Sequence, residues 1–387
     1  MPKVRNPKKA GRRDRIEEAA FAPDQVRGEF PVIDLPIRPP FPPQEAKSIS
    51  EIPSGEGWFY EPKFDGFRCL VFRKGKNVLL QSKAGQPLGR YFPEVIDGVQ
   101  QLPADAFVLD AEIVIFSNAQ LSFDDLLMRI HPAESRIRKL SQQTPATLMC
   151  FDLLIEGGSS LLQLPFSKRR SQLESFFEEL PMQGMVRLSQ GTTSRSEAED
   201  WMKNLGALGL DGIVAKRLDE PYRSGERTAM VKVKRIRTAD CVVGGFRYAE
   251  KGGGIGSLLL GLYNEEGLLD HVGFTSSFNA EQRQELKKIV EPQIGLPGFS
   301  GRAPGGPSRW STKRSTEWQP LKNKLVCEVQ YDHFSGGRFR HGTKFLRWRP
   351  EKQPRQCSFE QVRPPTRSAG HTPGAKSGRT IPKTKVA

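Results

Sequence analysis

The stretch EPKFDGFR, residues 61–68, places a lysine between a glutamate and an aspartate, just before a glycine and an arginine. A lysine amine is a nucleophile only when it is neutral, and the ordinary pKa of the side chain is about 10.4. Neutralising it at pH 7 costs roughly 4.6 kcal/mol, from about 1.36 kcal/mol per pKa unit. A nucleophilic Lys63 therefore needs neighbouring cations or a dry pocket. Taken alone, the stretch also fits a strand end followed by an Asp-Gly turn with exposed charges.

Acidic residues and another lysine recur in later strand-like runs. Glu112 lies inside the hydrophobic run LDAEIVIF (109–116), and GLDGIVAKR (209–217) carries Asp211 near one end and Lys216 near the other. Carboxylate oxygens are ligands that Mg²⁺ prefers, so Glu112 and Asp211 are candidates to hold Mg²⁺ or Mn²⁺. Each of these residues, taken singly, also fits ordinary surface charge.

Two more lysines alternate with valines in the run MVKVKR (230–235). Side chains alternate between the two faces of a β-strand. Val231 and Val233 are therefore expected in the core, and Lys232 and Lys234 in a common cleft. Two ammonium groups there would neutralise a bound phosphate and favour the neutral amine that a nucleophile needs.

Taken together and in this order, the runs resemble the covalent nucleotidyltransferase superfamily, whose members are DNA ligases, RNA ligases and mRNA capping enzymes. The matching blocks are EPKFDGFR, SKAGQPLGRYFPEV, DAEI, MCFDLL, DGIVAK, VKVK and RWRPEK. The resemblance is greatest to the minimal bacterial ATP-dependent DNA ligases and extends over about residues 35–352.

The resemblance implies a reaction in three steps. By that resemblance, Lys63 attacks the α-phosphate of ATP and forms an enzyme–AMP phosphoramidate; AMP then passes to the 5′-phosphate of a nick, and the 3′-hydroxyl finally seals the strand. Glu61 is expected to bind the adenine amine, and Phe151 to stack on the ring, although Phe151 also fits an ordinary core position. The other residues implied in nucleotide binding are Arg68 and Glu112 at the ribose, Lys83 in the second block, Lys216, Lys232 and Lys234 at phosphate, and Arg347 and Lys352 at the pyrophosphate.

This sequence departs from the family pattern at three positions. Asp211 replaces the usual glutamate and is one methylene shorter, which affects how a carboxylate reaches Mg²⁺. Lys83 replaces an arginine and lacks the bidentate fork. Glu351 stands where aspartate is usual. All three changes leave the nucleophile in place, so activity is expected.

Two domains of an α+β protein are expected, flanked by basic arms. Residues 35–237 form an adenylation (nucleotidyltransferase) domain, and residues 238–353 form a small OB-fold β-barrel domain. Residues 1–34 are basic and polar, and residues 354–387 are basic with almost no apolar side chains, which is typical of disordered arms. The stretch 301–318 and the run SGGRFRHGTK (335–344) are basic loops that fit either a DNA-backbone contact or plain surface.

Periodicity predicts the elements of both domains. The predicted strands are 67–72, 78–82, 107–116, 147–155, 210–218, 241–249, 256–264, 268–278, 324–334 and 344–350. Helices are expected at 167–180, at 196–209 with a capping box from Ser196 to Glu199, and at 279–292 with Asn279 as its cap.

The totals favour a nucleic-acid partner. The net charge of +15 suggests a polyanion, here nicked double-stranded DNA. The five cysteines are scattered without C-x-x-C spacing, and the histidines are too dispersed for a metal cluster, so we expect no zinc site. No apolar run approaches the roughly 20 residues of a membrane span. We expect a cytoplasmic, nucleoid-associated monomer.

The function implied is an ATP-dependent DNA ligase that seals nicks, most simply in DNA repair. Two alternatives stay open at this stage. One is an RNA ligase or a capping-type guanylyltransferase of the same superfamily. The other is a non-catalytic DNA-binding protein, against which the intact set of motif lysines argues.

Overall fold

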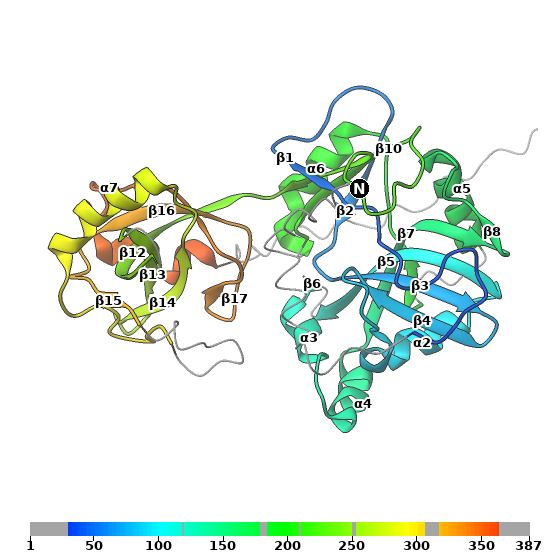
Figure 1. Ribbon diagram of the computed structural model, residues 1–387, viewed down its shortest axis with the longest axis horizontal. Helices are drawn as coiled ribbons and strands as arrows, with labels where there is room; N and C mark the ends of the chain where they lie inside the picture. The colour runs from blue at the N-terminus through cyan, green and yellow to red at the C-terminus, as the bar shows by residue number, and fades with distance from the viewer. Residues whose placement is uncertain are drawn as a thin grey trace, which may run out of the picture.

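The structure, a computed structural model, describes residues 30–117, 120–178, 184–208, 210–249, 253–305 and 317–363. Figure 1 shows two bodies, a larger one built on two sheets and a smaller barrel. The chain crosses between them where β11 (Met230–Lys234) ends and β12 (Arg237–Tyr248) begins. The predicted domain boundary at residue 237 lies at this crossing.

The larger body contains a seven-stranded sheet in the order β4-β3-β5-β7-β8, with β6 paired to β5 and β9 paired to β7. Its long central strands are rich in β-branched and aromatic residues, which suit a pleated, buried surface. The predicted strands of this region are confirmed. The bounds are β3 (Phe67–Lys74), β4 (Asn77–Ser82), β5 (Ala106–Ser117), β6 (Gln120–Leu121), β7 (Ala146–Glu156), β8 (Ser159–Ser160) and β9 (Val186–Leu188).

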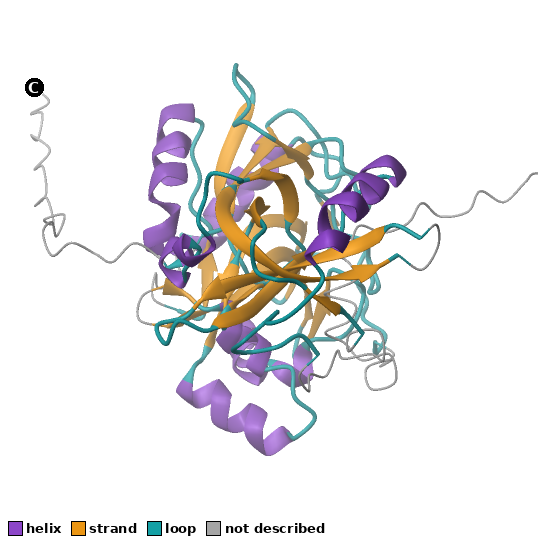
Figure 2. Ribbon diagram, turned by 90° about the vertical axis from the view of Figure 1, so that its left-hand side faces the viewer, coloured by secondary structure: helices purple, strands orange, loops and turns teal. Residues whose placement is uncertain are grey.

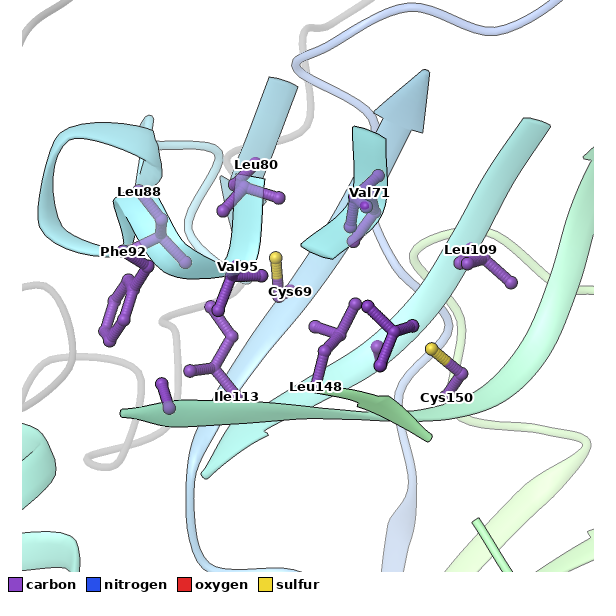
Figure 3. Close-up of a cluster of buried hydrophobic side chains, with 14 of the residues drawn as sticks. Cys69, Val71, Leu80, Leu88, Phe92, Val95, Leu109, Ile113, Leu148 and Cys150 are labelled. Atoms are coloured by element: carbon purple, nitrogen blue, oxygen red, sulfur yellow. The ribbon is translucent and has the colours of Figure 1, made fainter. Parts of the chain in front are cut away.

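A large apolar core lies between this sheet and its covering helices. Figure 3 shows Val71, Ile113 and Leu148 of the sheet gathered with Phe92 and Val95, and all five are fully buried. Burying such a side chain stabilises the fold by about 1.5–3 kcal/mol, so this core holds the sheet rigidly behind the site. The helices are η1 (Gly89–Tyr91), α2 (Pro93–Gln100), α3 (Phe123–Met128), α4 (Glu134–Gln143) and α5 (Phe166–Phe177).

A four-stranded sheet in the order β1-β11-β10-β2 completes the larger body. Its remaining strands are β1 (Lys47–Ile49), β2 (Trp58–Lys63) and β10 (Gly212–Arg217), and helix α6 (Arg195–Leu208) packs on one face. Val231 and Val233 lie in the core on that face, as the alternation in the sequence predicted.

The smaller body is a barrel of strands in the order β14-β13-β12-β16-β19, with β15 beside β12. Figure 2, viewed from this side, shows the strands curling around one another. An isolated bridge between Thr275 and Thr343 brings the two outer strands together. The predicted OB-type strands are confirmed. The bounds are β13 (Ile255–Tyr263), β14 (Leu269–Thr275), α7 (Ala280–Val290), η2 (Glu291–Gln293), β15 (Gln319–Pro320), β16 (Val326–Tyr331), β17 (Phe334–Ser335), β18 (Arg338–Phe339) and β19 (Lys344–Trp348).

Both predicted arms extend too far into the folded chain. Residues 354–363 form η3 (Pro354–Gln356) and η4 (Phe359–Val362) on the barrel, because Cys357 and Val362 are buried in its core. At the other end, Ile33 is 2% exposed and packs against the seven-stranded sheet. Isolated apolar residues in a polar stretch carry no periodicity, so the sequence gives little sign of this packing.

One of the two predicted helix caps is correct. Asn279 caps α7 and forms a capping box with Gln282. The cap of α6 is Ser194, whose hydroxyl accepts a hydrogen bond from the backbone of Glu197, so the predicted start at Ser196 is wrong. Ser196 lies inside the first turn, where a serine with an acidic residue three positions on mimics the capping pattern.

Candidate active site

A cleft opens between the two sheets of the larger body. Every predicted site residue of this domain lines the cleft except Asp211 and Lys234, which lie at its edge beside Lys63. The lining residues are Pro43, Gln44, Glu45, Ala46, Glu61, Pro62, Lys63, Phe64, Arg68, Lys83, Glu112, Phe151, Ser189, Val214, Lys216, Met230 and Lys232.

The four-stranded sheet forms one wall because its strand register aligns polar residues in rows. Glu61 of β2 lies opposite Val214 of β10, which in turn lies opposite Lys232 of β11. Residues directly opposite on antiparallel strands share a face, and so do residues two apart on one strand. Lys63 and Lys216 therefore point to the same side as Glu61, away from the apolar face that α6 covers.

Lys63 lies at the end of β2 and is only 8% exposed. Its ammonium is 2.7 Å from Oδ2 of Asp211, and Lys234 reaches the same oxygen at 3.6 Å. The backbone N–H of Asp211 also donates to the carbonyl of Lys63 at 3.0 Å. The local fold therefore fixes Lys63 beside a carboxylate and a second cation in a buried place, and the burial and the cation favour the neutral amine that a nucleophile needs.

Glu61 lies deeper in the cleft and is 2% exposed. Lys216 approaches its Oε2 at 2.6 Å, and Arg170 approaches its Oε1 at 3.2 Å. Burial raises the pKa of Glu61, while the charges of Lys216 and Arg170 oppose that rise. Lys216 also donates to the carbonyl of Phe151 at 2.9 Å, so its ammonium lies beside Glu61 and the Phe151 ring.

Arg68 belongs to a second network at the cleft wall. Its guanidinium donates twice to the fully buried Asp110, at 2.5 and 2.6 Å, and lies 4.6 Å from the centre of the Phe151 ring. Tyr222 donates its hydroxyl to the same carboxylate at 2.6 Å and accepts the backbone N–H of Gln44. These contacts orient Arg68 without using all of its donors.

Two carboxylates at the cleft come from different sheets. Glu112 of β5 lines the cleft, and Asp211 precedes β10 beside Lys63. In the part of the chain that the structure describes, no group of three or more His, Cys, Asp or Glu side chains is placed to hold a metal. One or two carboxylates are nevertheless what Mg²⁺ ordinarily takes from a protein when phosphates supply further oxygens, so the donor set fits that ion.

Comparison with known families agrees with this geometry. A family model described as "ATP dependent DNA ligase domain" matches residues 41–234, and one described as "ATP dependent DNA ligase C terminal region" matches residues 251–352. The chain belongs to the ATP-dependent DNA ligase family. The predicted family, the adenylation and OB fold and the ATP-dependent ligase activity are thereby confirmed.

Relatives of the ligase span nearly the same length. DNA ligase C1 of Mycolicibacterium smegmatis is 45% identical over 343 residues, 86% of this chain and 97% of that protein. DNA ligase C of Mycobacterium tuberculosis is 38% identical over 348 residues, 86% of this chain and 96% of that one. A solved structure described as "Pmar-Lig_PreS3" covers 76% of this chain and 63% of its own, with a TM-score of 0.54 and 17% identity, and so supports the fold alone.

The last motif block of the ligase lies on the barrel and away from the cleft. Arg347 pairs with Glu328 at 2.8 Å, and Lys352 pairs with Asp240 at 3.3 Å. Neither Arg347 nor Lys352 lines the cleft in this arrangement. Their predicted contact with pyrophosphate thus requires the barrel to move.

A hairpin of the barrel touches the edge of the site. Arg340 pairs with Asp65 and lies over the Phe123 ring, 3.0 Å from its centre. Asp332 lies 3.0 Å from the ammonium of Lys234, which also approaches Asp211. Through Lys234 the barrel therefore contacts the ion pair between Lys63 and Asp211. The sequence of the stretch 335–344 fits either a DNA contact or plain surface, and in the structure its Arg340 pairs with the domain that carries the nucleophile. Most of the other basic loop weighed for DNA, residues 306–316 of 301–318, lies outside the described residues.

Sequence reasoning missed several residues that shape the cleft of the ligase. Arg170 and Ser189 contact or line its deep end, and Gln44 and Met230 line its rim and wall. Arg170 stands in a basic run on α5, where nothing distinguishes a buried arginine from its exposed neighbours.

The helices of the described part of the chain lack the length and apolar character needed to cross a membrane.

Proposed function

We propose that the ligase joins nicked DNA through a covalent AMP on Lys63. The neutral amine attacks the α-phosphorus of ATP, a P–N bond forms, and the bond to the bridging oxygen breaks as pyrophosphate leaves. A 5′-phosphate oxygen of the nick then takes the AMP and frees the lysine. The 3′-hydroxyl finally attacks the phosphorus of the 5′-phosphate and loses its proton to water, and AMP leaves with the electron pair of the broken P–O bond.

The observation that carries this proposal is the position of Lys63 in the lining of the cleft together with Glu61, Phe151 and Lys216, 2.7 Å from the Asp211 carboxylate. In the proposed first step, that carboxylate positions the amine, the ammonium proton passes to solvent, and the nearby Lys234 cation favours the neutral form of Lys63.

The other residues at the cleft are proposed to bind the base, the ribose and the phosphates of the nucleotide. Glu61 is proposed to accept the adenine amine, and Phe151 to stack on the base. Arg68 and Glu112 are proposed at the ribose. Phosphate binding is proposed for Lys83, Lys216, Lys232 and Lys234, with Lys216 reaching the nucleotide from beside Glu61.

A divalent ion is part of the proposal. Glu112 and Asp211 would hold Mg²⁺ or Mn²⁺ together with phosphate oxygens, and the bound ion would neutralise charge on the phosphates. The barrel supplies Arg347 and Lys352 to the pyrophosphate by turning about the crossing between β11 and β12.

Incubation with α-labelled ATP and Mg²⁺, followed by a denaturing gel, tests the proposal. We expect covalent label from ATP and not from GTP, and label that passes to nicked DNA. Label from GTP would instead indicate a capping-type enzyme, transfer only to nicked RNA an RNA ligase, and no label a binding protein. We also propose action as a monomer in the cytoplasm, at the nucleoid, in DNA repair, since the charge of +15 favours DNA as the partner.

A further inference from the structure

Arg170 lies outside every motif block and outside the lining of the cleft, yet it is 5% exposed and touches two groups that do line it. Its Nη1 is 3.2 Å from Oε1 of Glu61. Its Nη2 donates to the backbone carbonyl of Ser189 at 2.9 Å. The arginine thus joins helix α5 to two separate segments at the deep end of the cleft.

The guanidinium is itself held in place by two further contacts. Its Nε lies 2.6 Å from Glu174 one helical turn later, and its Cζ lies over the Phe59 ring, 4.9 Å from the ring centre. Arginine presents its donors in a rigid planar fork, so fixing one edge and one face fixes the rest. Arg170 is therefore a rigid support for the Glu61 carboxylate.

The two oxygens of Glu61 are held unequally. Lys216 lies 2.6 Å from Oε2, whereas Arg170 lies 3.2 Å from Oε1. A carboxylate oxygen has two lone-pair sites, so Oε1 keeps the better capacity to accept a hydrogen bond from a ligand. An ionised carboxylate accepts but does not donate, and burial, which raises the pKa of Glu61, is opposed by the charges of Lys216 and Arg170.

We infer that Arg170 is the positioning residue that gives the cleft its selectivity for a 6-aminopurine. By holding Glu61 as a fixed acceptor between two cations, Arg170 makes the exocyclic amine of the base a required partner. A base with a carbonyl oxygen at that position places a hydrogen-bond acceptor against the Glu61 carboxylate, which is also an acceptor. Such a base is therefore rejected. This inference rests on the proposed function, because it assumes that Glu61 faces the base.

The backbone carbonyl of Ser189 is a second acceptor that Arg170 holds. That carbonyl belongs to a residue of the cleft lining and already accepts a hydrogen bond from Arg170. Without Arg170, both the Ser189 carbonyl and Oε1 of Glu61 lose a fixed donor. A Glu61 carboxylate that is no longer fixed can turn away from the base, so the amine gains less from it and the site discriminates less between ligands.

The test measures nucleotide binding by calorimetry in a Lys63→Ala background, so that no covalent transfer intervenes. The probes are ATP and purine riboside 5′-triphosphate, which lacks the 6-amine. We expect Arg170→Met to weaken ATP binding by roughly 10-fold or more while changing the affinity for the amine-free probe less than about 3-fold. The preference for ATP should therefore collapse. An equal loss with both probes would mean a merely structural role and would overturn the inference.

Two further variants keep the test decisive. Arg170→Lys retains the charge but lacks the fork that reaches both Glu61 and Ser189, so an intermediate preference is expected; a full preference would overturn the need for Arg170. Lys168→Met is the matched control, because Lys168 lies on the same helix with its side chain exposed, and the preference for ATP should stay within about 2-fold of the parent.

Failure of the two proposals can be told apart. Covalent labelling of the unmodified chain with ATP tests the ligase reaction by itself. Binding in the Lys63→Ala background tests base selectivity whether or not label forms. A labelled enzyme whose ATP preference is untouched by Arg170→Met would keep the proposed function and reject only the inference.

Discussion

Lys216→Met is the perturbation that tests the buried cluster most directly. Lys216 is 6% exposed, lies 2.6 Å from Glu61 and donates to the carbonyl of Phe151. Methionine keeps the length and apolar stem of the side chain but removes the charge. Glu61 is then left in the same buried place with Arg170 as its remaining close cation.

The size of the effect follows from the protonation state of Glu61. When the carboxylate is charged, removing one partner of a buried pair costs about 3–5 kcal/mol. Here Arg170 remains, so we expect about 3 kcal/mol. When Glu61 is protonated, the loss is that of ordinary hydrogen bonds and falls to about 1 kcal/mol.

The pH dependence has a definite sign. Burial raises the pKa of Glu61, Lys216 and Arg170 oppose that rise, and Asp152 adds a little to it. A group whose pKa is higher in the folded state contributes stability at low pH and loses that contribution as pH rises through the folded value. Removing Lys216 raises the folded pKa of Glu61 further, so the gap between parent and variant widens from acidic to alkaline pH.

The assay is urea unfolding of both proteins at about pH 5 and about pH 8. Lys203→Met is the control, because Lys203 pairs with Asp200 on the surface and its side chain is 71% exposed. The double variant Glu61→Gln with Lys216→Met should recover stability at the higher pH. A deficit of the same size at both pH values would refute the reasoning, as would a deficit no larger than that of the control.

Three further outcomes are expected. Lys63→Ala should abolish covalent AMP and leave nick binding largely intact; normal labelling would place the nucleophile elsewhere. Asp211→Ala should lower self-adenylylation far more than Asp211→Glu, which a rate assay checks; equal rates would make Asp211 a turn residue only. Lys352→Ala should slow self-adenylylation roughly a hundredfold, from a leaving-group term of about 3 kcal/mol, yet seal a pre-adenylylated nick normally; equal losses in both half-reactions would reject a role with pyrophosphate.

Much of the fold could be predicted because its strands are long and patterned. The run 230–235 alternates valine with lysine, and the structure places both valines on the core side. The barrel was predictable from short strands between glycine turns. Residues 354–363 were not, because their packing depends on Cys357 and Val362, which are single apolar residues with no period.

The site was predictable only where a motif names a residue. Glu61, Lys63 and Phe151 follow from the motif blocks and do line one cleft. Arg170 and the Arg340 contact with Asp65 depend on elements far apart in sequence that meet only in the fold. Such pairs have no local signature, because either partner alone fits a solvated surface charge.

The pairing of β1 and β2 with strands near the end of the domain has a consequence for synthesis. The register joins Lys47 to Val231 and Lys63 to Gly212, and Gln44 bonds Tyr222 across 178 positions. At about 5–20 residues per second, roughly 10–30 seconds separate translation of Lys63 from completion of β11. The nucleophile is thus made early and its cleft is completed late. Nucleotide binding by a ribosome-bound chain would therefore mark the moment at which the whole adenylation domain has emerged.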